Sequence, residues 1–210
     1  MRRFAGMTAL LLMLSGAAPA QVLPIPGAPG VAPAIPPPAV PMPRPGAAEQ
    51  RREELNRLMD ALAKAPDETS AAPLQARIQQ LWAEGGTPAV GLLLRKGLRA
   101  MEANALEEAV EDLDAAIVLQ PDFAESWVLR AQAQAAAGDR RAAAADLREA
   151  LRLEPRHFGA LLALSQLQEE AGDSPGALRS LEAALRIHPQ LPGGAQRRRE
   201  LRRRAQGDAT

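Results

Sequence analysis

Three prolines, Pro121, Pro155 and Pro189, stand 34 residues apart, and the segments that they close repeat one another. Eight residues before each proline there is a leucine, and seventeen residues before it there is a turn-forming residue. These positions are Leu113, Leu147 and Leu181, and Asn104, Gly138 and Gly172. A fixed period of this length is typical of stacked helical hairpins, because a single hairpin buries its apolar face only against its neighbours. The sequence therefore predicts an all-α fold, an α-solenoid of antiparallel helix hairpins.

The second repeat indicates why each unit should fold as helix, turn and helix. Asp122, followed three residues later by Glu125, predicts a capping box at the start of the first helix. Gly138 suits the left-handed residue that ends this helix, and Asp139 can cap the second one. In the first repeat Ala105 stands where Asp139 stands in the second, and it offers no side-chain acceptor. The turn of the first repeat is therefore predicted to be the weakest.

Small and large residues recur at fixed places in each unit. They are Leu93, Gly97, Ala109, Leu113, Ala116 and Pro121 in the first, Trp127, Ala131, Ala143, Leu147, Ala150 and Pro155 in the second, and Leu161, Ser165, Ala177, Leu181, Ala184 and Pro189 in the third. In this pattern the units resemble tetratricopeptide (TPR) repeats, although Ala100, Gln134 and Gln168 replace the family's usual tyrosine. The resemblance implies a right-handed superhelical stack whose first helices line a concave groove.

The resemblance also implies a binding surface, because partners of this family usually lie in that groove. The residues expected to face it are Leu94, Leu98, Met101, Glu125, Val128, Gln132, Leu162, Gln166 and Glu169. Apolar and amide side chains of this kind suit a short peptide or a helix. Some relatives hold a C-terminal carboxylate with basic and asparagine residues. Leu94, Leu98 and Val128 stand at the corresponding places here, so such a clamp is disfavoured.

Residues 1–20 have the pattern of a signal peptide. Arg2 and Arg3 come first, an apolar stretch spans residues 7–14, and Ala18-Pro19-Ala20 forms a small-x-small cleavage site. The alternative is an uncleaved anchor helix, but the apolar stretch is short for a bilayer. We expect a periplasmic or secreted protein without stable membrane insertion after cleavage.

Residues 21–48 are predicted to be a disordered, proline-rich linker. Residues 22–46 contain ten prolines, which remove backbone donors and fix φ, so neither helix nor sheet is favoured. The alternative is a ligand for a proline-recognising module, since Pro33-x-x-Pro36 and Pro38-x-x-Pro41 occur. Such spacings also arise by chance in proline-rich segments.

Two amphipathic segments follow, in residues 49–65 and 73–84, and Pro66 and several polar residues separate them. Residues 49–89 are therefore predicted to form a helical hairpin. We interpret it as a degenerate repeat that precedes three repeats in residues 90–191. The terminal repeat of such a stack usually departs from the pattern, because one of its faces is exposed to water and must be polar.

The last segment, residues 192–210, is strongly basic. Residues 195–210 hold six arginines and two acids, whereas residues 90–189 hold 16 acidic and 11 basic residues and the whole chain is neutral. The arginines are Arg197, Arg198, Arg199, Arg202, Arg203 and Arg204. We interpret the segment as a capping helix or tail whose charge the acidic repeats compensate. No nucleic acid is expected as a partner, because no aromatic residue interleaves with the arginines.

Residues suited to catalysis or metal binding are few. The chain has no cysteine, and its two histidines, His157 and His188, lie close to prolines between hairpins. Without carboxylates at metal-ligand spacing, we interpret them as turn residues and expect no enzyme, metal or cofactor. The leading hypothesis is an adaptor that binds a peptide or helix of an envelope protein in its groove. The alternative is binding of an anionic envelope polymer or lipid surface through the arginine-rich tail.

Overall fold

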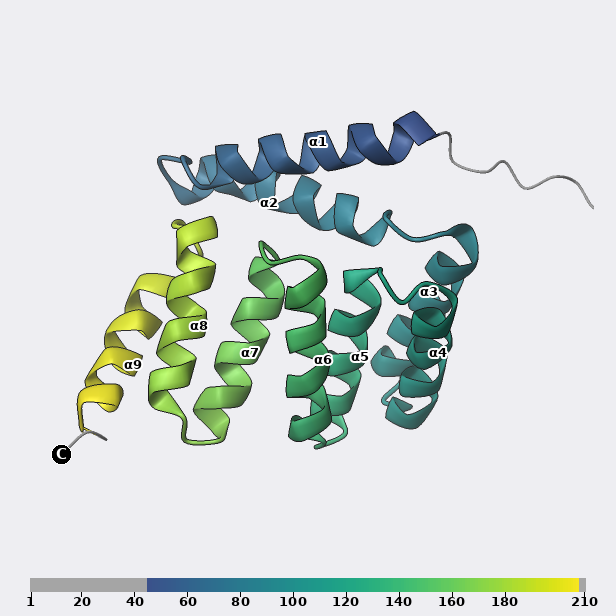
Figure 1. Cartoon of the computed structure of the whole chain (residues 1–210). Coiled ribbons are helices and arrows are strands. Elements are labelled where there is room, and N and C mark those ends of the chain that lie inside the picture. The colour runs from purple at the N-terminus through teal and green to yellow at the C-terminus, as the bar shows by residue number, and fades with distance from the viewer. Residues whose placement is uncertain (1–44, 208–210) are drawn as a thin grey trace, which may run out of the picture. The chain divides into compact units, whose positions relative to one another are not determined.

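A computed structural model describes residues 45–207, in which nine α-helices are found. Three consecutive antiparallel hairpins form an array, namely α3 (Pro88–Glu102) with α4 (Leu106–Leu119), α5 (Ala124–Ala136) with α6 (Arg140–Leu153), and α7 (Phe158–Glu170) with α8 (Ser174–Ile187). Their helices stand side by side in one row (Figure 1). The predicted all-α solenoid is confirmed. The predicted signal peptide, and the predicted linker up to residue 44, lie outside the described residues.

The recurring leucines and small residues hold each hairpin together. Leu113, Leu147 and Leu181 are buried in the hairpin cores, together with the recurring alanines. Gly97 shows why a small residue recurs in the first helix, since a Cβ at this position would lie 2.8 Å from Cγ of Leu113. The two helices of the first hairpin could not approach so closely with a larger residue there.

The turns within the hairpins follow the sequence prediction. Asn104, Gly138 and Gly172 all have positive φ, at 58°, 90° and 79°. The Asp139 carboxylate accepts a hydrogen bond from the backbone N–H of Ala142 at 2.9 Å, whereas Ala105 makes no side-chain cap. The first repeat therefore lacks the cap that its successors have, as predicted.

The predicted capping box in the second repeat is wrong. α5 begins at Ala124 with Phe123 at its N-cap, and neither Asp122 nor another side chain caps it. The Phe123 ring is buried against the Gly85-Gly86 link instead, where Cβ atoms would lie 2.7 and 2.9 Å from the ring. The N-cap residue of α5 thus contributes a buried ring in place of a capping side chain, and the two glycines leave room for that ring.

The N-terminal hairpin consists of α1 (Pro45–Leu62) and α2 (Glu68–Ala83), and both helices begin earlier than predicted. The Asp67 carboxylate accepts a hydrogen bond from the Ser70 N–H at 2.8 Å, which fixes the start of α2 five residues before Pro73. Pro73 lies inside the helix, where its ring removes one backbone donor.

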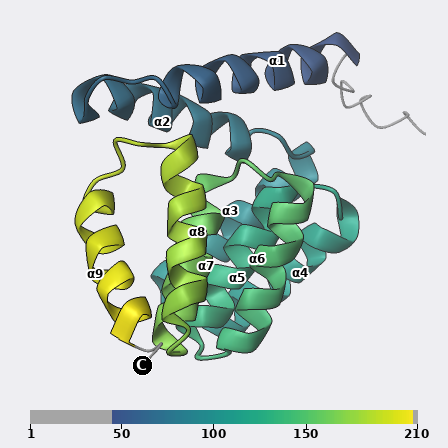
Figure 2. The same ribbon diagram turned by 60° about the vertical axis from the view of Figure 1, so that its left-hand side comes forward.

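The interpretation of this hairpin as a repeat at the end of the stack is wrong. α2 and α3 follow each other in the chain but do not pack side by side, as α4 and α5 or α6 and α7 do. The hairpin lies across the ends of the array helices (Figure 1, Figure 2). Met59, Leu62 and Ile78 share one buried cluster with Phe158 and Ala184 of the third repeat. The apolar face of the hairpin therefore packs on the third repeat and not on the first.

Polar contacts fix the hairpin to the connections between repeats. Arg156 donates to Asp60 at 2.8 Å, and the Gln190 amide donates to the carbonyl oxygens of Ala65 and Pro66 at 3.2 and 3.0 Å. These connections are part of the regular array, so they position the hairpin relative to its inner surface.

At the other end of the array, α9 (Gly194–Gly207) packs on α8. Its Leu201 is fully buried with Leu181 and Leu185. The basic segment is therefore a docked helix up to residue 207. No helix within residues 45–207 is both long and apolar enough to cross a bilayer.

Candidate functional site

A cavity of about 560 Å³ lies where α2 meets the first helices of the three repeats. Five of the nine residues predicted to face the groove line this cavity, and they are Leu94, Leu98, Glu125, Val128 and Gln132. Leu94 and Val128 are almost completely buried and form part of its floor, whereas Leu98 remains 39% exposed. Leu94 and Val128 therefore line the cavity without projecting freely into it.

α2 closes one side of the cavity with an aromatic ring. Trp82 stacks on His157 with ring centroids 3.8 Å apart and an angle of 10° between the planes, and it also contacts Phe158 at 5.1 Å. All three residues line the cavity, and none was among the predicted site residues. The repeat pattern contains no signal for this wall, because α2 does not belong to a repeat.

His157 links the cavity wall to the backbone. Its Nδ1 accepts a hydrogen bond from the Ala160 N–H at 3.0 Å, so the ring proton lies on Nε2 and is donated to the Glu125 carboxylate at 3.1 Å. This histidine was expected to be a turn residue, and the contact with Glu125 gives it a partner outside its own turn. Glu125 lies 32 residues earlier in the chain, and stacking of the repeats brings the two together.

The cavity combines an apolar floor with a charged rim. Glu84 and Glu125 contribute carboxylates to its lining, and Arg95 contributes one cation. The Glu125 carboxylate is held by His157, whereas Arg95 forms no ion pair within residues 45–207. This arrangement can take up an apolar side chain and hold polar groups beside it.

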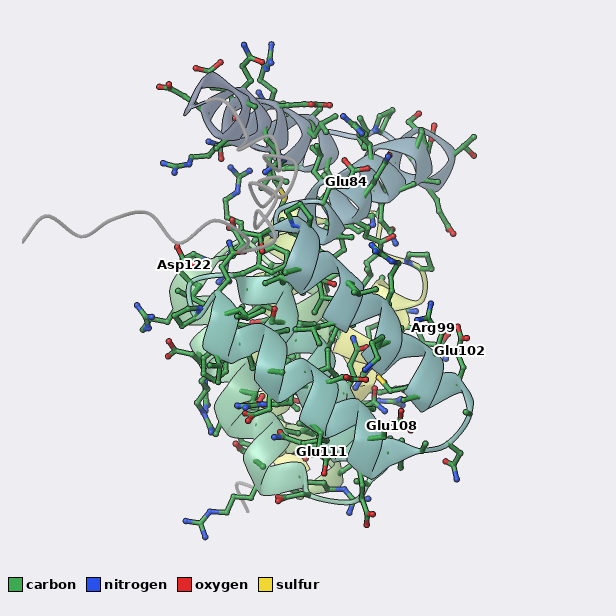
Figure 3. All side chains as sticks on the ribbon, turned by 90° about the vertical axis from the view of Figure 1, so that its right-hand side faces the viewer. Glu84, Arg99, Glu102, Glu108, Glu111 and Asp122 are labelled. Atoms are coloured by element: carbon green, nitrogen blue, oxygen red, sulfur yellow. The ribbon has the colours of Figure 1, made fainter. Side chains whose placement is uncertain are left out.

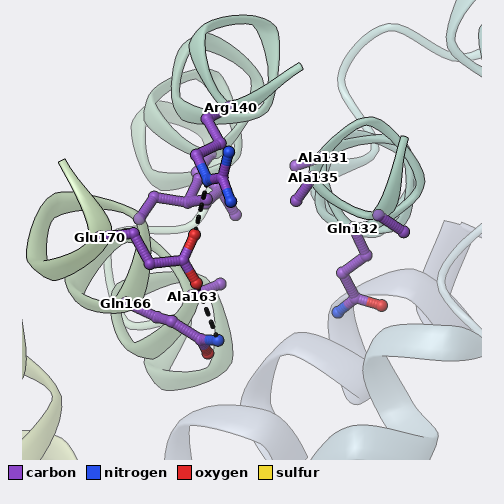
Figure 4. Close-up of a pocket in the computed structure, with 10 residues that line it drawn as sticks. Ala131, Gln132, Ala135, Arg140, Ala163, Gln166 and Glu170 are labelled. Carbon is purple, nitrogen blue, oxygen red and sulfur yellow. Dashed lines mark hydrogen bonds and ion pairs between the residues drawn. The ribbon is translucent and has the colours of Figure 1, made fainter. Parts of the chain in front are cut away.

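Gln166 lies in a second cavity of about 340 Å³, which Gln132 also lines. Alanines of α5 and α7 leave this space open (Figure 4). At its edge Arg140 forms an ion pair with Glu170 at 2.7 Å, and the Gln166 amide donates to the same carboxylate at 3.4 Å. Gln132 therefore borders both cavities, and together they extend the inner surface along α5 and α7.

The remaining three predicted groove residues have structural partners. Met101 packs against the core of the first hairpin, and Leu162 packs between the clusters below α2 and beside α9. Glu169 forms ion pairs with Arg197 at 3.1 Å and Arg204 at 2.6 Å. The inner surface of the third repeat is therefore covered on one side by α2 and on the other by α9, which the repeat pattern did not predict.

The six arginines of the basic segment fall into two groups. Arg197, Arg202 and Arg204 form ion pairs with Glu169 and Glu182. The other three, Arg198, Arg199 and Arg203, are exposed and form no ion pair within residues 45–207.

His188 does not join His157 in a site. It is buried, its Nε2–H donates to the Gln75 side-chain oxygen at 2.8 Å, and burial lowers its pKa. Within residues 45–207 no group of three histidine, aspartate or glutamate side chains could hold a metal ion.

Comparison with known proteins agrees with this geometry. The sequence pattern described as "Tetratricopeptide repeat" matches residues 94–139 and 129–192. A TPR repeat-containing protein of Rhizobium etli is 30% identical over 95 residues, which are 45% of this chain and 47% of that protein. The chain thus spans about half the length of this curated relative.

Solved structures share the fold at low sequence identity. The Sgt2 TPR domain from Aspergillus fumigatus has a TM-score of 0.55 at 21% identity and covers 59% of this chain and 83% of that one. The first TPR of Spaghetti (RPAP3), bound to an HSP90 peptide, has a TM-score of 0.53 at 19% identity over 58% and 94% of the two chains. The TPR2B domain of yeast Sti1, in complex with pHsp70, has a TM-score of 0.52 at 21% identity over 58% and 99%. Residues 94–192, slightly less than half of the chain, therefore form tetratricopeptide repeats.

Proposed function

We propose that the array is a non-catalytic scaffold that binds a peptide or a short helix of a partner protein on its inner surface. The observation that carries this proposal is the 560 Å³ cavity, whose floor is apolar and which is open enough to leave Leu98 exposed. A single inserted apolar side chain would bury area there and so anchor the peptide. Gln132 and Glu125 can then bond to polar groups beside this anchor.

The comparisons support the class of partner. Two solved structures with this fold are complexes, one with an HSP90 peptide and one with pHsp70. In the chain described here, leucine and valine stand at the positions that hold a terminal carboxylate in some relatives. We therefore propose an internal apolar segment as the bound element, in place of a chain terminus.

The partner is further proposed to be an envelope protein. This part rests on the signal-peptide pattern of residues 1–20, which would place both proteins beyond the inner membrane.

A matched pair of substitutions tests the groove. Leu98 and Val118 are both exposed on the first hairpin, at 39% and 74%, but only Leu98 lines the cavity. The intact chain is used to capture proteins from an envelope extract, and the partner is then titrated against Leu98→Glu and Val118→Glu. Leu98→Glu should weaken binding at least tenfold, which corresponds to about 1.4 kcal/mol, while Val118→Glu binds like the wild type. Equal binding by both variants would overturn the proposal.

The alternative function, through the arginine tail, stays a prediction. Three of its six arginines are already engaged by glutamates of the array, so less charge remains for an anionic polymer or lipid. Binding that disappears above physiological salt and survives Leu98→Glu would favour it.

A further inference from the structure

The face of the first hairpin that points away from the second is uncovered. Leu92 on this face is 51% exposed, whereas the residues 34 and 68 positions later, Ser126 and Ala160, are 0% exposed. Those two residues are covered by the preceding repeat. No repeat precedes Leu92, because the N-terminal hairpin lies across the helix ends and does not pack on this face. The first hairpin therefore exposes a surface that the other two hairpins bury against the preceding repeat.

This open face, formed by α3 and α4, is apolar in part and acidic in part. Leu92 is its exposed large hydrophobic side chain; the others exposed within residues 45–207 are Leu98, which lines the cavity, and Val118 and Leu119 at the end of α4. Glu102, Glu108 and Glu111 surround the face, as Figure 3 shows with Arg99 beside them. These three glutamates form no ion pair within the described part of the chain. The face thus carries more unpaired negative than positive charge.

The opposite end of the array has the complementary charge. α9 packs on α8 with its Leu201 side, so Arg199 and Arg203, which are four residues apart, lie together on its outer side. Both arginines are exposed and have no ionic partner within residues 45–207, and Arg198 lies next to them. On its inner side the same helix already pairs arginines with Glu169 and Glu182 of the array. Glutamates on array helices are therefore the partners that this helix uses within its own chain.

We propose that the chain associates head to tail, with the open face of α3 and α4 receiving the outer side of α9 from a second copy. Arg199 and Arg203 would pair with Glu108 and Glu111, and their aliphatic arms would cover Leu92. The two surfaces differ, so the contact is heterologous and each added copy leaves one free end of each kind. This inference does not depend on the proposed function of the groove.

Exposed ion pairs are individually weak and are screened by salt, so the association should depend on concentration and ionic strength. In sedimentation velocity, the intact protein should shift from monomer to a series of larger species as its concentration rises at low salt. Addition of about 0.5 M salt, where the Debye length is only a few ångströms, should return it to monomer. A monomer at every concentration would overturn the proposal, whether the face stays free or residues 1–44 cover it.

Charge reversal tests which surfaces meet. Glu108→Arg with Glu111→Arg makes both ends basic, and Arg199→Glu with Arg203→Glu makes both ends acidic, so each double variant alone should be monomeric. An equal mixture of the two should associate again, because each end then meets its opposite. The control is Arg141→Glu with Arg148→Glu, on exposed positions of α6, which changes the net charge by the same amount as Arg199→Glu with Arg203→Glu. This control should associate like the wild type. Loss of association in this control as well would show a general charge effect and contradict the assigned surfaces.

The absence of cysteine from the sequence allows a direct test of polarity. Leu92→Cys and Arg203→Cys are prepared separately and treated with a short bis-maleimide linker. The mixture should give cross-linked dimers, while each variant alone gives few. Efficient cross-linking of Leu92→Cys with itself would reveal a symmetric dimer and overturn the head-to-tail arrangement.

Discussion

Trp82 is the residue on which docking of the N-terminal hairpin depends most. It is buried, it stacks on His157 and it touches Phe158, so Trp82→Ala removes the aromatic contact between α2 and the third repeat. Truncation of a buried tryptophan costs about 3–5 kcal/mol. Because α1 and α2 meet the array only at the ends of its helices, we expect much of this loss to appear as local detachment of the hairpin.

A second substitution, Trp82→Phe, tests the contribution of the indole nitrogen separately from that of the buried ring. Trp82 Nε1 is buried without a hydrogen-bond partner within residues 45–207, and such a group costs about 1–3 kcal/mol. Trp82→Phe loses apolar area but also removes this unpaired donor, so its net cost should stay below about 1 kcal/mol. Trp127 is the matched control, because its Nε1 donates to the Pro121 carbonyl oxygen at 2.9 Å. Trp127→Phe loses a hydrogen bond and should cost more than Trp82→Phe.

Urea unfolding followed by circular dichroism gives the free energies of unfolding, and hydrogen exchange resolved by peptide locates the change. Trp82→Ala should accelerate exchange in residues 45–83 and leave α5 and α6 protected. Unchanged exchange in residues 45–83, or a Trp82→Phe variant as unstable as Trp82→Ala, would refute the reasoning.

Three further predictions concern the array itself. Ala105→Asp should raise the free energy of unfolding by about 0.5–1 kcal/mol, because it supplies the cap that α4 lacks; a urea titration that shows no gain would contradict this. Gly138→Val should lower the thermal midpoint, since its φ of 90° costs a β-branched residue about 1–3 kcal/mol, whereas Ala137→Val, one position earlier at ordinary φ, should have a smaller effect. Burial lowers the pKa of His188, so its imidazole binds a proton more readily in the unfolded chain than in the folded one. The free energy of unfolding should therefore fall as the pH drops below the ordinary value of 6.5. His188→Gln should make the free energy of unfolding less dependent on pH in this range.

The array was predictable from the sequence because its determinants are local and repeated. The positions of Leu113, Leu147 and Leu181 mark the hairpin cores, and the positive φ of Gly138 and Gly172 follows from their place before a cap. Each of these features depends on contacts within one repeat or between neighbouring repeats. Every repeat makes the same contacts, so the same residue types recur every 34 positions.

The position of the N-terminal hairpin was not predictable in this way. Its apolar face is evident in the sequence, but Trp82 meets His157 across 75 residues, and no period links the two. The same contact changes the site, since α2 covers Leu162 and adds an aromatic wall beside Leu94. Glu169 is likewise not available in the groove, because it forms ion pairs with Arg197 and Arg204 of α9. Local patterning therefore identified residues of α3 and α5 that line the cavity, but it did not anticipate that α2 and α9 cover Leu162 and Glu169 of α7.

The proposed function requires a partner to bind on the inner surface beside α2. Hydrogen exchange of the intact protein, measured with and without the captured partner, tests it most directly. We predict slower exchange at the end of α2 and in α3 and α5, around Trp82, Leu98 and Gln132, with little change in α4 and α6. Protection confined to α9, with the inner helices exchanging as in the free protein, would contradict the account.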